Sequence, residues 1–457
     1  MTSTAYAAIL SLCLLSLISA SCGRGESYEP PEGEGPWVLV DLYHTTIQNP
    51  VDYRLDKGNY SYQGVFGYAR AFDHLEANGY KWRALRNSPL SKQRLEGFDV
   101  LFINLVHQER PDFTDEEVEI IKEYVENGGG LFVIADHTNV YYHAERVNRF
   151  LEPMGIEVTY HTAVDYGDAS VTGLGWIAMD ATKVDHPVNE DVGIISFQTG
   201  GTMRKTNDNG TVTLTLSERG LSDLWDESSG IGFYGNWSFD GDESLEPRGA
   251  SPTGMVGEYG EGRVVVVGDQ NMFGDVWLHF AGNFEHWSNS IEWLAKQENE
   301  GTPLRDQKPT GFNIAFPVHY SNYAPGNTAP DNYFVFFVNF NRDQQVTNRG
   351  VVELRNREDA LVMTPVKTTL EQEDLDKVKA YLDSGKKVTL LLEADSIANN
   401  NTRETLKLLQ YLAPELTITT GDETISFDQP FDDLVSALRG AEFNKVDGLH
   451  DLTSEHM

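Results

Sequence analysis

The sequence predicts an α/β protein with a doubly wound, mostly parallel sheet, and three observations in one stretch support this prediction. Thr114 and Glu117 fit a capping box, in which a hydroxyl and a carboxylate each accept a backbone N–H at a helix start. Apolar residues then recur at helical spacing as far as Asn127 and Gly128, which suit a helix end. The unbroken apolar run 131–135 follows, and such a run is typical of a strand buried on both faces of a parallel sheet.

The same alternation of strand and helix recurs along the first lobe, residues 37–297. Apolar runs predict strands at 38–44, 80–85, 99–106 and 156–161, and helical spacing predicts helices at 66–77 and 140–154. This order favours right-handed βαβ units and a parallel sheet. Residues 163–262 differ, because short Val, Thr and aromatic runs alternate there with Gly, Asn and Asp, which predicts an antiparallel β insertion. A strand at 264–267 and a helix at 283–296 close the lobe.

An internal repeat predicts a second, reduced α/β lobe at residues 313–445. Tyr381 stands where Tyr124 stands in the first copy, and repetition of a whole helix–strand unit indicates duplication. The second copy has Glu393 and Ala394 where the first has a strand-end Asp and His, and it lacks the β insertion. We therefore expect a structural or docking copy.

The segments outside the two lobes have compositions of their own. Residues 298–312 are charged and contain Pro and Gly, which predicts a linker, and the polar residues 446–457 predict a frayed tail. Residues 23–36 are rich in Gly, Glu and Pro and predict a flexible tether, because such a segment cannot bury a core.

The first 22 residues predict export. Residues 5–20 are apolar and too short to span a bilayer, which is typical of a secretory signal. Residues 19–23 resemble a bacterial lipoprotein cleavage box in which Cys22 is lipidated, with plain secretion or an uncleaved anchor as the alternatives. We expect a lipid anchor in the outer membrane, facing the periplasm or the surface. The reason is that Gly23 follows Cys22, whereas an Asp at that position would resemble an inner-membrane retention signal.

The charge balance excludes two classes of partner. The chain of 457 residues holds 70 acidic and 35 basic residues, a formal charge of −35. Nucleic-acid binding needs Lys and Arg to displace counterions from phosphate, so we expect none, nor docking on anionic lipid by charge. The acidic residues predict a solvated surface, with clustered Ca²⁺ sites as the alternative.

Two segments resemble a known superfamily. A helix ending in Tyr124-Val125, a Gly triplet, an apolar strand and His137 resemble the ThuA-like branch of the class I glutamine amidotransferase-like superfamily. They also resemble related domains of gliding-motility auxiliary proteins and intraflagellar transport proteins. Residues 264–273, with a following helix that contains Asn289 and Trp293, are the second match. The resemblance covers residues 37–297 and implies an amidotransferase- or flavodoxin-like fold.

The resemblance also implies what chemistry is missing. Amidotransferases of this superfamily use a Cys at a tight turn after a strand, but this chain has only Cys13 and Cys22, both in the signal region. Glutamine hydrolysis by that mechanism is therefore excluded. No Gly-x-Ser-x-Gly elbow follows a predicted strand, so a serine nucleophile gains no support either.

Polar residues at the predicted strand ends form the candidate ligand-binding site. They are Asp41, His44, His107, Asp136, His137, Asp269 and Asn271. In a doubly wound sheet these ends share one rim, where ligands bind. His107, His137, Asp136 and Asp269 are candidate ligands for Zn²⁺, Mn²⁺ or Fe²⁺, which with an open position would activate water. The alternatives are that Asp136 and His137 hydrogen-bond the following loop, or that the rim is a metal-free polar pocket.

We therefore expect a non-catalytic ligand-binding or scaffold lipoprotein of the bacterial cell envelope. Its partner would be an envelope protein or a small polar ligand such as a sugar, and no cofactor is certain beyond a candidate divalent metal. The alternative is a ThuA-like metal-dependent hydrolase or carbohydrate-processing protein that uses the Asp136/His137 site. Trp residues between positions 176 and 287 suit either sugar stacking or core packing.

Overall fold

The structure is a computed structural model, and it describes most of the first lobe and part of the second. The described residues are 31–45, 67–167, 170–173, 176–225, 235–275, 277–298, 300–309, 311–316, 345–347, 354, 357–366, 369–391, 403–420 and 423–440. The predicted signal peptide, residues 23–30 of the tether and the polar tail lie outside these ranges. Within them, none of the helices has the length and apolar character that a membrane crossing requires.

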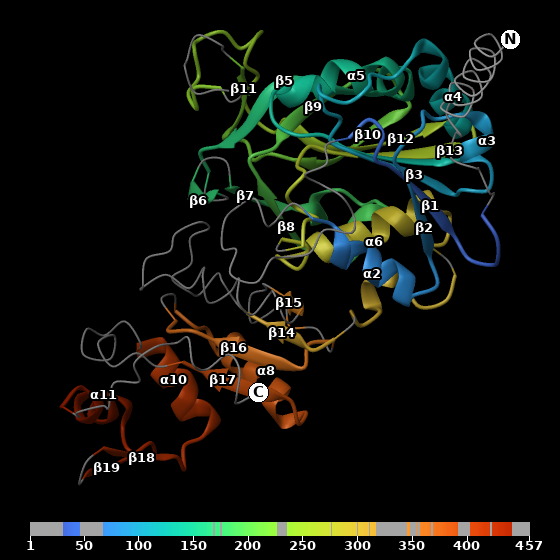
Figure 1. The fold of residues 1–457 in the computed structure, drawn as a ribbon. Coiled ribbons are helices and arrows are strands. Elements are labelled where there is room, and N and C mark those ends of the chain that lie inside the picture. Colours follow the sequence, from blue (N-terminus) through green and yellow to red (C-terminus); the bar gives the residue numbers. More distant parts are fainter. Residues whose placement is uncertain are drawn as a thin grey trace, which may run out of the picture.

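A seven-stranded sheet forms the centre of the first lobe (Figure 1), with strand order β10-β12-β13-β4-β3-β1-β2. Its strands are β1 (Trp37–Asp41), β2 (Lys81–Leu85), β3 (Val100–Asn104), β4 (Gly130–Ile134), β10 (Gly210–Thr215), β12 (Pro252–Tyr259) and β13 (Gly262–Val267). The five strands from β13 to β2 are parallel, whereas β12 and β10 continue the sheet in antiparallel pairing. Every residue of β3 and β4 is buried, as expected of central strands covered on both faces.

Helices cover both faces of this sheet, so the predicted doubly wound architecture is confirmed (Figure 1). α2 (Ala69–Ala77) and α6 (Asn283–Leu294) pack on one face, and α3 (Lys92–Leu95), α4 (Asp115–Glu126) and α5 (His143–Leu151) pack on the other. The capping box at Thr114 begins α4 as predicted, and Gly128 follows its end with a φ of +107°. Trp287 of α6 packs with its ring centroid 5.5 Å from that of Phe132 in β4.

The strand predicted at 156–161 differs from the prediction. β5 (Ile156–Asp165) leaves the parallel sheet and pairs antiparallel with β11 (Gly220–Leu224) and β9 (Gly201–Lys205). Its first half alternates between buried and partly exposed residues, the pattern of a strand with one solvated face. The insertion therefore begins at Ile156, and part of it rejoins the main sheet as β10 and β12. A third sheet contains β6 (Ser170–Gly173), β7 (Trp176–Asp180) and β8 (Ile194–Gln198).

The second lobe repeats four strands of the first. β14 (Asn313–Ala315), β15 (Gln345–Thr347), β16 (Ala360–Met363) and β17 (Lys387–Leu390) form a parallel sheet in the order β15-β14-β16-β17. This order corresponds to β2-β1-β3-β4. The helices and hairpin of the lobe are α8 (Gln372–Asp383), α10 (Arg403–Leu412), β18 (Thr417–Thr420), β19 (Glu423–Ser426) and α11 (Phe431–Gly440). The described residues of this lobe thus form a second α/β unit; positions 393 and 394 lie outside them.

Buried contacts join the two lobes through the predicted linker. Leu304 and Arg305 of the short helix η7 (Leu304–Asp306) are buried, and the Leu304 N–H donates to Glu292 Oε1 of α6 over 2.6 Å. Arg357 of the second lobe pairs with Glu285 of α6 and donates to the Arg305 carbonyl. Its guanidinium lies 4.6 Å from the centroid of the Phe284 ring. The second lobe is therefore anchored on α6.

Candidate functional site

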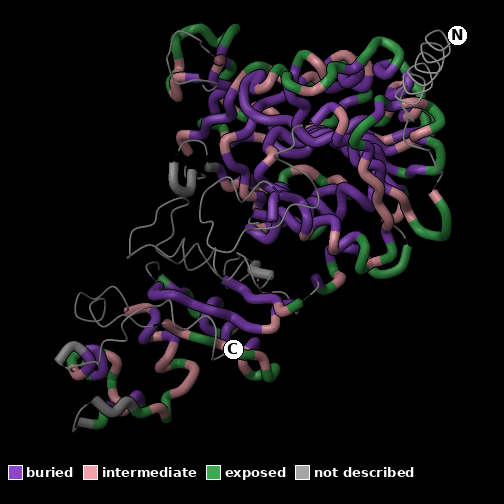
Figure 2. Tube along the Cα trace, in the orientation of Figure 1, coloured by how far each residue is buried: buried purple, intermediate pink, exposed green. Residues whose placement is uncertain are grey.

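A buried polar network lies beyond the carboxyl ends of three central strands. Asn104 ends β3, Asp136 follows β4 by two residues, and Asp269 follows β13 by two. Tyr68, at the start of α2, and Gln270 complete what we call the strand-end network: Tyr68, Asn104, Asp136, Asp269 and Gln270. Figure 2 shows that the centre of this lobe is almost entirely buried, and Tyr68, Asn104, Asp136 and Asp269 are each at most 2% exposed.

The Asp269 carboxylate accepts backbone N–H groups from two segments near the strand ends. Its Oδ2 accepts the Gln198 N–H over 2.6 Å, and its Oδ1 accepts the Asn271 N–H over 2.7 Å. Gln198 ends β8 in the insertion, so the carboxylate ties the insertion to the end of β13. Both carboxylate oxygens are thereby engaged by backbone donors.

Asp136 is held from the other side by α5. Its Oδ1 accepts the His137 N–H over 2.7 Å, and its own N–H donates to His143 Nε2 over 3.2 Å. Since His143 Nδ1 lies 2.7 Å from the Val140 carbonyl, the ring is neutral with its proton on Nδ1. Burial lowers the pKa of His143 to about 4, which agrees with a neutral ring.

The two carboxyl groups share an environment that favours the protonated form. Burial raises the pKa of Asp136 well above its ordinary value, and the nearby charge of Asp269 raises it further. Burial raises the pKa of Asp269 to about 7, against the effect of the backbone N–H groups that it accepts. We assign the retained proton to the pair rather than to one residue, because the two groups titrate together.

Tyr68 and Asn104 lie beside this pair. The Tyr68 hydroxyl donates to the Gln270 carbonyl, and burial raises its pKa, with further increases from Asp269 and Asp136. The Asn104 amide lies close enough to that hydroxyl to oppose the shift. Within the described residues, however, neither its nitrogen nor its oxygen makes a hydrogen bond of good geometry. A fully buried amide without good partners is costly to the fold, so Asn104 has capacity to bind a ligand through both of its polar atoms.

His137 and Asn271 adjoin the strand-end network. His137 Nδ1 lies 3.2 Å from Thr138 Oγ1, and its Nε2 lies 3.9 Å from Asp136 Oδ1. The Asn271 side chain donates to the Gln198 carbonyl over 3.2 Å. The His137 N–H bond to Asp136 and the contact of His137 with Thr138 are of the kind expected if Asp136 and His137 hydrogen-bond the following loop.

Asp41 and His44 form a separate buried cluster with Glu117. Asp41 Oδ2 lies 2.7 Å from His44 Nδ1, and Glu117 Oε1 lies 3.3 Å from His44 Nε2. Although burial lowers it, the carboxylates of Asp41 and Glu117 raise the pKa of His44 to about 9, so the ring is charged at neutral pH. Its ring stacks on Phe113 at 4.0 Å, and it is fully buried. His44 therefore connects Asp41 at the end of β1 to Glu117 of α4.

His107 lies in a turn three residues beyond the end of β3. Its backbone N–H donates to the His44 carbonyl over 3.1 Å, and its Nδ1 accepts the Glu109 N–H over 3.1 Å. Its ring packs 4.2 Å from the ring of Tyr141. Burial lowers the pKa of His107 below its ordinary value. The predicted strand 99–106 ends early, at Asn104, which moves His107 off the strand end.

The insertion covers the strand ends through two glycines. A Cβ on Gly201 would lie 2.3 Å from the Asp136 carbonyl, and one on Gly268 would lie 2.4 Å from the Gly201 carbonyl. The Gly201 N–H donates to the Gly268 carbonyl over 2.7 Å. Only glycine permits this backbone approach. The rim predicted from the sequence is therefore a buried layer under the insertion in the part of the chain that the structure describes.

A metal ion in a protein is held by several His, Cys, Asp or Glu side chains that converge on one point. Across the described ranges, no three His, Cys, Asp or Glu side chains are arranged to hold a metal ion. His107, His137, Asp136 and Asp269 thus do not form a four-ligand group there. The binding roles of the seven predicted residues stay predictions.

Sequence reasoning missed Tyr68, Asn104 and the second role of Glu117. Asn104 has the same signal as Asp136, a polar residue at the end of an apolar run, but the apolar residues on both sides of it predict one strand that continues to Val106, whereas β3 ends at Asn104. Glu117 was recognised as a cap, and its Oε2 does accept the Thr114 N–H over 2.9 Å. Nothing in the sequence places Tyr68 near strand ends 36 residues or more away.

Comparisons with solved structures find neighbours of low sequence identity to this chain. The N-terminal domain of mmIFT52 is 15% identical with a TM-score of 0.38, covering 56% of this chain and 96% of the domain. A ThuA-like protein from Parabacteroides merdae is 13% identical with a TM-score of 0.34, covering 59% and 94%. Cytoplasmic protein STM3548 from Salmonella typhimurium is 16% identical with a TM-score of 0.33, covering 56% and 98%. Likeness at this level concerns the fold and assigns no activity.

The comparison with curated proteins finds no match. Two proteins described as ThuA-like are among the structural neighbours, whereas the gliding-motility branch stays a prediction. A family model described as "Domain of unknown function (DUF4350)" matches residues 61–291, slightly more than half of the chain. The chain belongs to the DUF4350 family.

Proposed function

We propose that this protein is a non-catalytic binding lipoprotein of the bacterial cell envelope, whose strand-end network takes a small, neutral, polar ligand such as a sugar. The observation that carries the proposal is the fully buried Asn104 amide, which lies beside the Tyr68 hydroxyl. Within the described residues, neither polar atom of this amide has a well-aligned hydrogen-bond partner. An amide offers two donors and an acceptor, the pattern that complements a hydroxyl-rich ligand.

The charges of the site favour a neutral ligand over an ionic one. Asp136 and Asp269 have raised pKa values and retain a proton between them at neutral pH. An anion would be repelled by the remaining carboxylate, and a buried cation would lose hydration that the engaged oxygens of Asp269 cannot replace. Both oxygens already accept backbone N–H groups from Gln198 and Asn271.

The absence of a Cys nucleophile after Cys22 supports a binding role. The chain has no Cys after Cys22, so the Cys-dependent mechanism of the resembling superfamily has no residue to start from. The proposed lipid on Cys22, within Ser19-Ala20-Ser21-Cys22-Gly23, would hold the two lobes at the envelope, where the second lobe serves as a docking copy. This part of the proposal rests on the sequence.

Ligand binding is tested with Asn104→Leu, which removes both polar atoms at nearly constant volume. The full chain is screened by saturation-transfer NMR against neutral mono- and disaccharides, beside Gln93→Leu, a control at the exposed opposite edge. We expect at least one sugar to bind the wild type and the control but not Asn104→Leu. Equal binding by all three proteins, or no binding by the wild type, would overturn the proposal. Asp136→Asn is the second variant if Asn104→Leu does not fold.

The anchor is tested separately with Cys22→Ser. Expressed in a bacterium fed a labelled fatty acid, the wild type is expected to carry the label and to sediment with membranes. The variant is expected to lose both properties. A labelled variant, or an unlabelled wild type, would contradict lipidation at Cys22.

A hydrolase is the second candidate, because two buried carboxyl groups with raised pKa values beside a Tyr hydroxyl suit general acid–base chemistry. The measurement is turnover of chromogenic glycosides with and without added Zn²⁺ or Mn²⁺. Turnover that disappears in Asp136→Asn would favour this candidate over the binding role. A wild type without turnover that still binds the sugar would exclude it for those substrates.

A further inference from the structure

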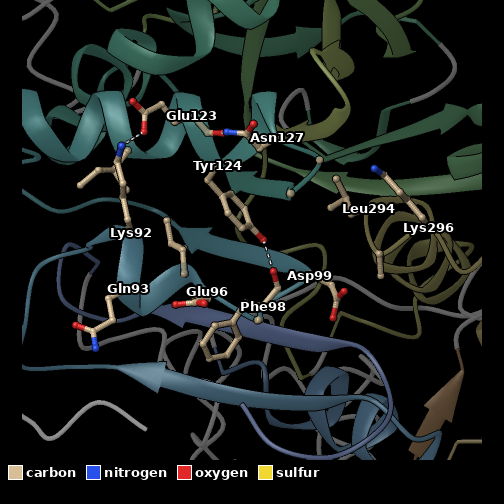
Figure 3. A pocket seen from close by; sticks show the side chains of 16 residues that line it. Lys92, Gln93, Glu96, Phe98, Asp99, Glu123, Tyr124, Asn127, Leu294 and Lys296 are labelled. Carbon is tan, nitrogen blue, oxygen red and sulfur yellow. Dashed lines mark hydrogen bonds and ion pairs between the residues drawn. The ribbon is translucent and has the colours of Figure 1, made fainter. Parts of the chain in front are cut away.

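The amino-terminal edge of the first sheet, opposite the strand-end network, carries a hollow of about 710 Å³ (Figure 3). Its apolar wall includes Leu95, Phe98, Ile120 and Leu294, and its polar rim includes Lys92, Asp99, Glu123 and Lys296. The ring of Tyr124 crosses it, and the hydroxyl donates to the Phe98 carbonyl over 3.1 Å. None of these residues belongs to the proposed sugar site.

The second lobe shows what occupies the equivalent place. Tyr381 repeats Tyr124, and its hydroxyl donates to the Glu358 carbonyl over 3.1 Å, as that of Tyr124 does to Phe98. Lys386 donates to the same Glu358 carbonyl over 2.6 Å, and its ammonium lies 5.1 Å from the centroid of the Tyr381 ring. One carbonyl therefore accepts both a hydroxyl and an ammonium, one for each lone pair.

The first lobe keeps the acceptors but lacks this cation. Gly129 stands where Lys386 stands, two residues after the helix-end Asn127, and a Cβ there would lie 2.4 Å from the Tyr124 ring. The Phe98 carbonyl thus has the capacity for a second donor that its counterpart uses. The duplication identifies the missing group as an ammonium on an alkyl stem.

The neighbouring carboxylates differ in the same sense. Asp359 Oδ2 accepts the Asn313 N–H over 2.8 Å, and its Oδ1 pairs with Lys308 over 2.6 Å. Asp99 Oδ2 accepts the Trp37 N–H over 2.7 Å, but no Lys or Arg in the described ranges forms an ion pair with it. Burial raises the pKa of Asp99, whereas at Asp359 the Asn313 N–H and the Lys308 ammonium outweigh burial and lower the pKa.

The lysines at the rim of the hollow do not replace the missing cation. Lys92 pairs with Glu123, and Lys296 Nζ donates to the Glu261 carbonyl over 2.7 Å. The carboxyl-terminal ends of α4 and α6 also face the hollow, through Asn127 and Leu294. The negative pole of a helix lies at this end, so both helices favour a cation there.

We propose that this hollow binds a primary ammonium group on an alkyl stem, with the ammonium between the Asp99 carboxylate, the Phe98 carbonyl and the Tyr124 ring. The stem lies along the apolar wall that includes Leu95 and Phe98. Ammonium groups donate three hydrogen bonds and are attracted to aromatic faces, which matches these three acceptors. A free diamine and a lysine side chain of a partner protein offer the same chemistry.

Titration calorimetry of the full chain tests the proposal with three probes: 1,5-diaminopentane, a lysine capped at both backbone ends, and 1,5-pentanediol as the uncharged analogue. We expect the wild type to bind both amines but not the diol. Asp99→Asn should weaken amine binding about tenfold, since an ion pair is lost. The matched control is Asp208→Asn, a fully exposed Asp in the turn before β10, and it should leave the affinity unchanged.

The outcomes separate the sources and decide the proposal. Tighter binding of capped lysine indicates a protein partner, and tighter binding of the diamine indicates a free amine. Equal binding of the diol, unchanged affinity in Asp99→Asn, or no heat from either amine would overturn the assignment. If Asp99→Asn does not fold, NMR of the Asp99 carboxyl carbon decides: bound amine should lower its pKa in the wild type, and no shift would contradict the site.

Discussion

The two lobes share one structural unit but differ in what covers it. Both contain four parallel strands in the same order. In each, a Tyr hydroxyl donates to a backbone carbonyl just before the third strand: Tyr124 to Phe98 in the first lobe, and Tyr381 to Glu358 in the second. In the first lobe β4 is fully buried, and Phe132 lies under Trp287 of α6. In the second lobe β17 alternates between exposed and partly buried residues, with Thr389 at the position of Phe132. An exposed polar residue of β17 thus stands where β4 has a buried aromatic one.

The same difference separates the two strand ends. In the first lobe the insertion covers the ends of β4 and β13, and Asp269 ties it down through the Gln198 N–H. The second lobe has no counterpart of that insertion in its sequence. A duplicated α/β unit therefore supplies the scaffold, whereas the candidate site is specific to the copy that gained a cover.

The largest expected effect contrasts Phe132→Ala with Thr389→Ala. Phe132 is fully buried among aromatic rings, so its truncation should cost about 4 kcal/mol in free energy of unfolding. Thr389 is exposed, so its truncation should change stability by less than about 0.5 kcal/mol. Urea unfolding followed by tryptophan fluorescence measures the first, since all eight Trp residues lie between positions 37 and 293. Circular dichroism measures the second, and a costly Thr389→Ala would contradict the comparison.

The next effect concerns the anchor between the lobes. Arg357→Met removes the ion pair of the buried Glu285 carboxylate with Arg357 and should cost about 3 kcal/mol of stability. The double variant Arg357→Met/Glu285→Gln should recover part of that loss, because the buried negative charge is also removed. Urea unfolding of the three proteins and the wild type checks this. A double variant less stable than the single one would show that the pair does not join the lobes as described.

A pH effect should follow from the His44 cluster, which is not repeated among the described residues of the second lobe. The folded-state pKa of His44 is raised to about 9 from an ordinary 6.5, so its stabilising charge is fully present below pH 6.5 and lost as pH rises to about 9. The loss should be about 2–3 kcal/mol across that window. Urea unfolding at several pH values checks it. His44→Gln should be less stable than the wild type at pH 6, and its free energy of unfolding should change less between pH 6 and pH 9. A decline as steep as that of the wild type would contradict the assignment.

The smallest expected effect compares the two helix starts. Thr114 Oγ1 accepts the Glu117 N–H over 3.2 Å, so Thr114→Ala should cost about 1 kcal/mol. At the start of α8, the Glu371 N–H donates to Asp374 Oδ2 over 3.0 Å, as the Thr114 N–H does to Glu117 in α4. Glu371→Ala retains this hydrogen bond because the donor is a backbone group. Its cost should be below about 0.5 kcal/mol. Hydrogen exchange in α4 and α8 measures both, and equal losses of protection would contradict the difference.

Local sequence rules predicted the central elements, because their signals lie within a few residues of one another. The Thr114–Glu117 cap, the Gly128 helix end and the fully buried β4 all agree with the prediction. β5 was assigned to the parallel sheet wrongly, since an alternating strand and a short apolar run look alike until their partners are known.

The candidate site was predictable only in part. The positions of Asp136 and Asp269 at strand ends followed from the apolar runs before them. The insertion that covers them, and the role of Tyr68, depend on contacts such as the one between Tyr68 and Gln270, 202 residues apart. The contact of His44 with Glu117 of α4 likewise joins residues 73 positions apart, which the strand pattern alone does not predict.

The most direct measurement is the metal content and sugar binding of one preparation of the full chain. Elemental mass spectrometry after dialysis would precede NMR with the neutral sugars, beside Asp136→Asn and Asn104→Leu. A binding protein of the proposed kind predicts no stoichiometric transition metal and sugar binding that Asn104→Leu abolishes. A stoichiometric metal that Asp136→Asn loses, with sugar turnover instead of simple binding, would contradict the account.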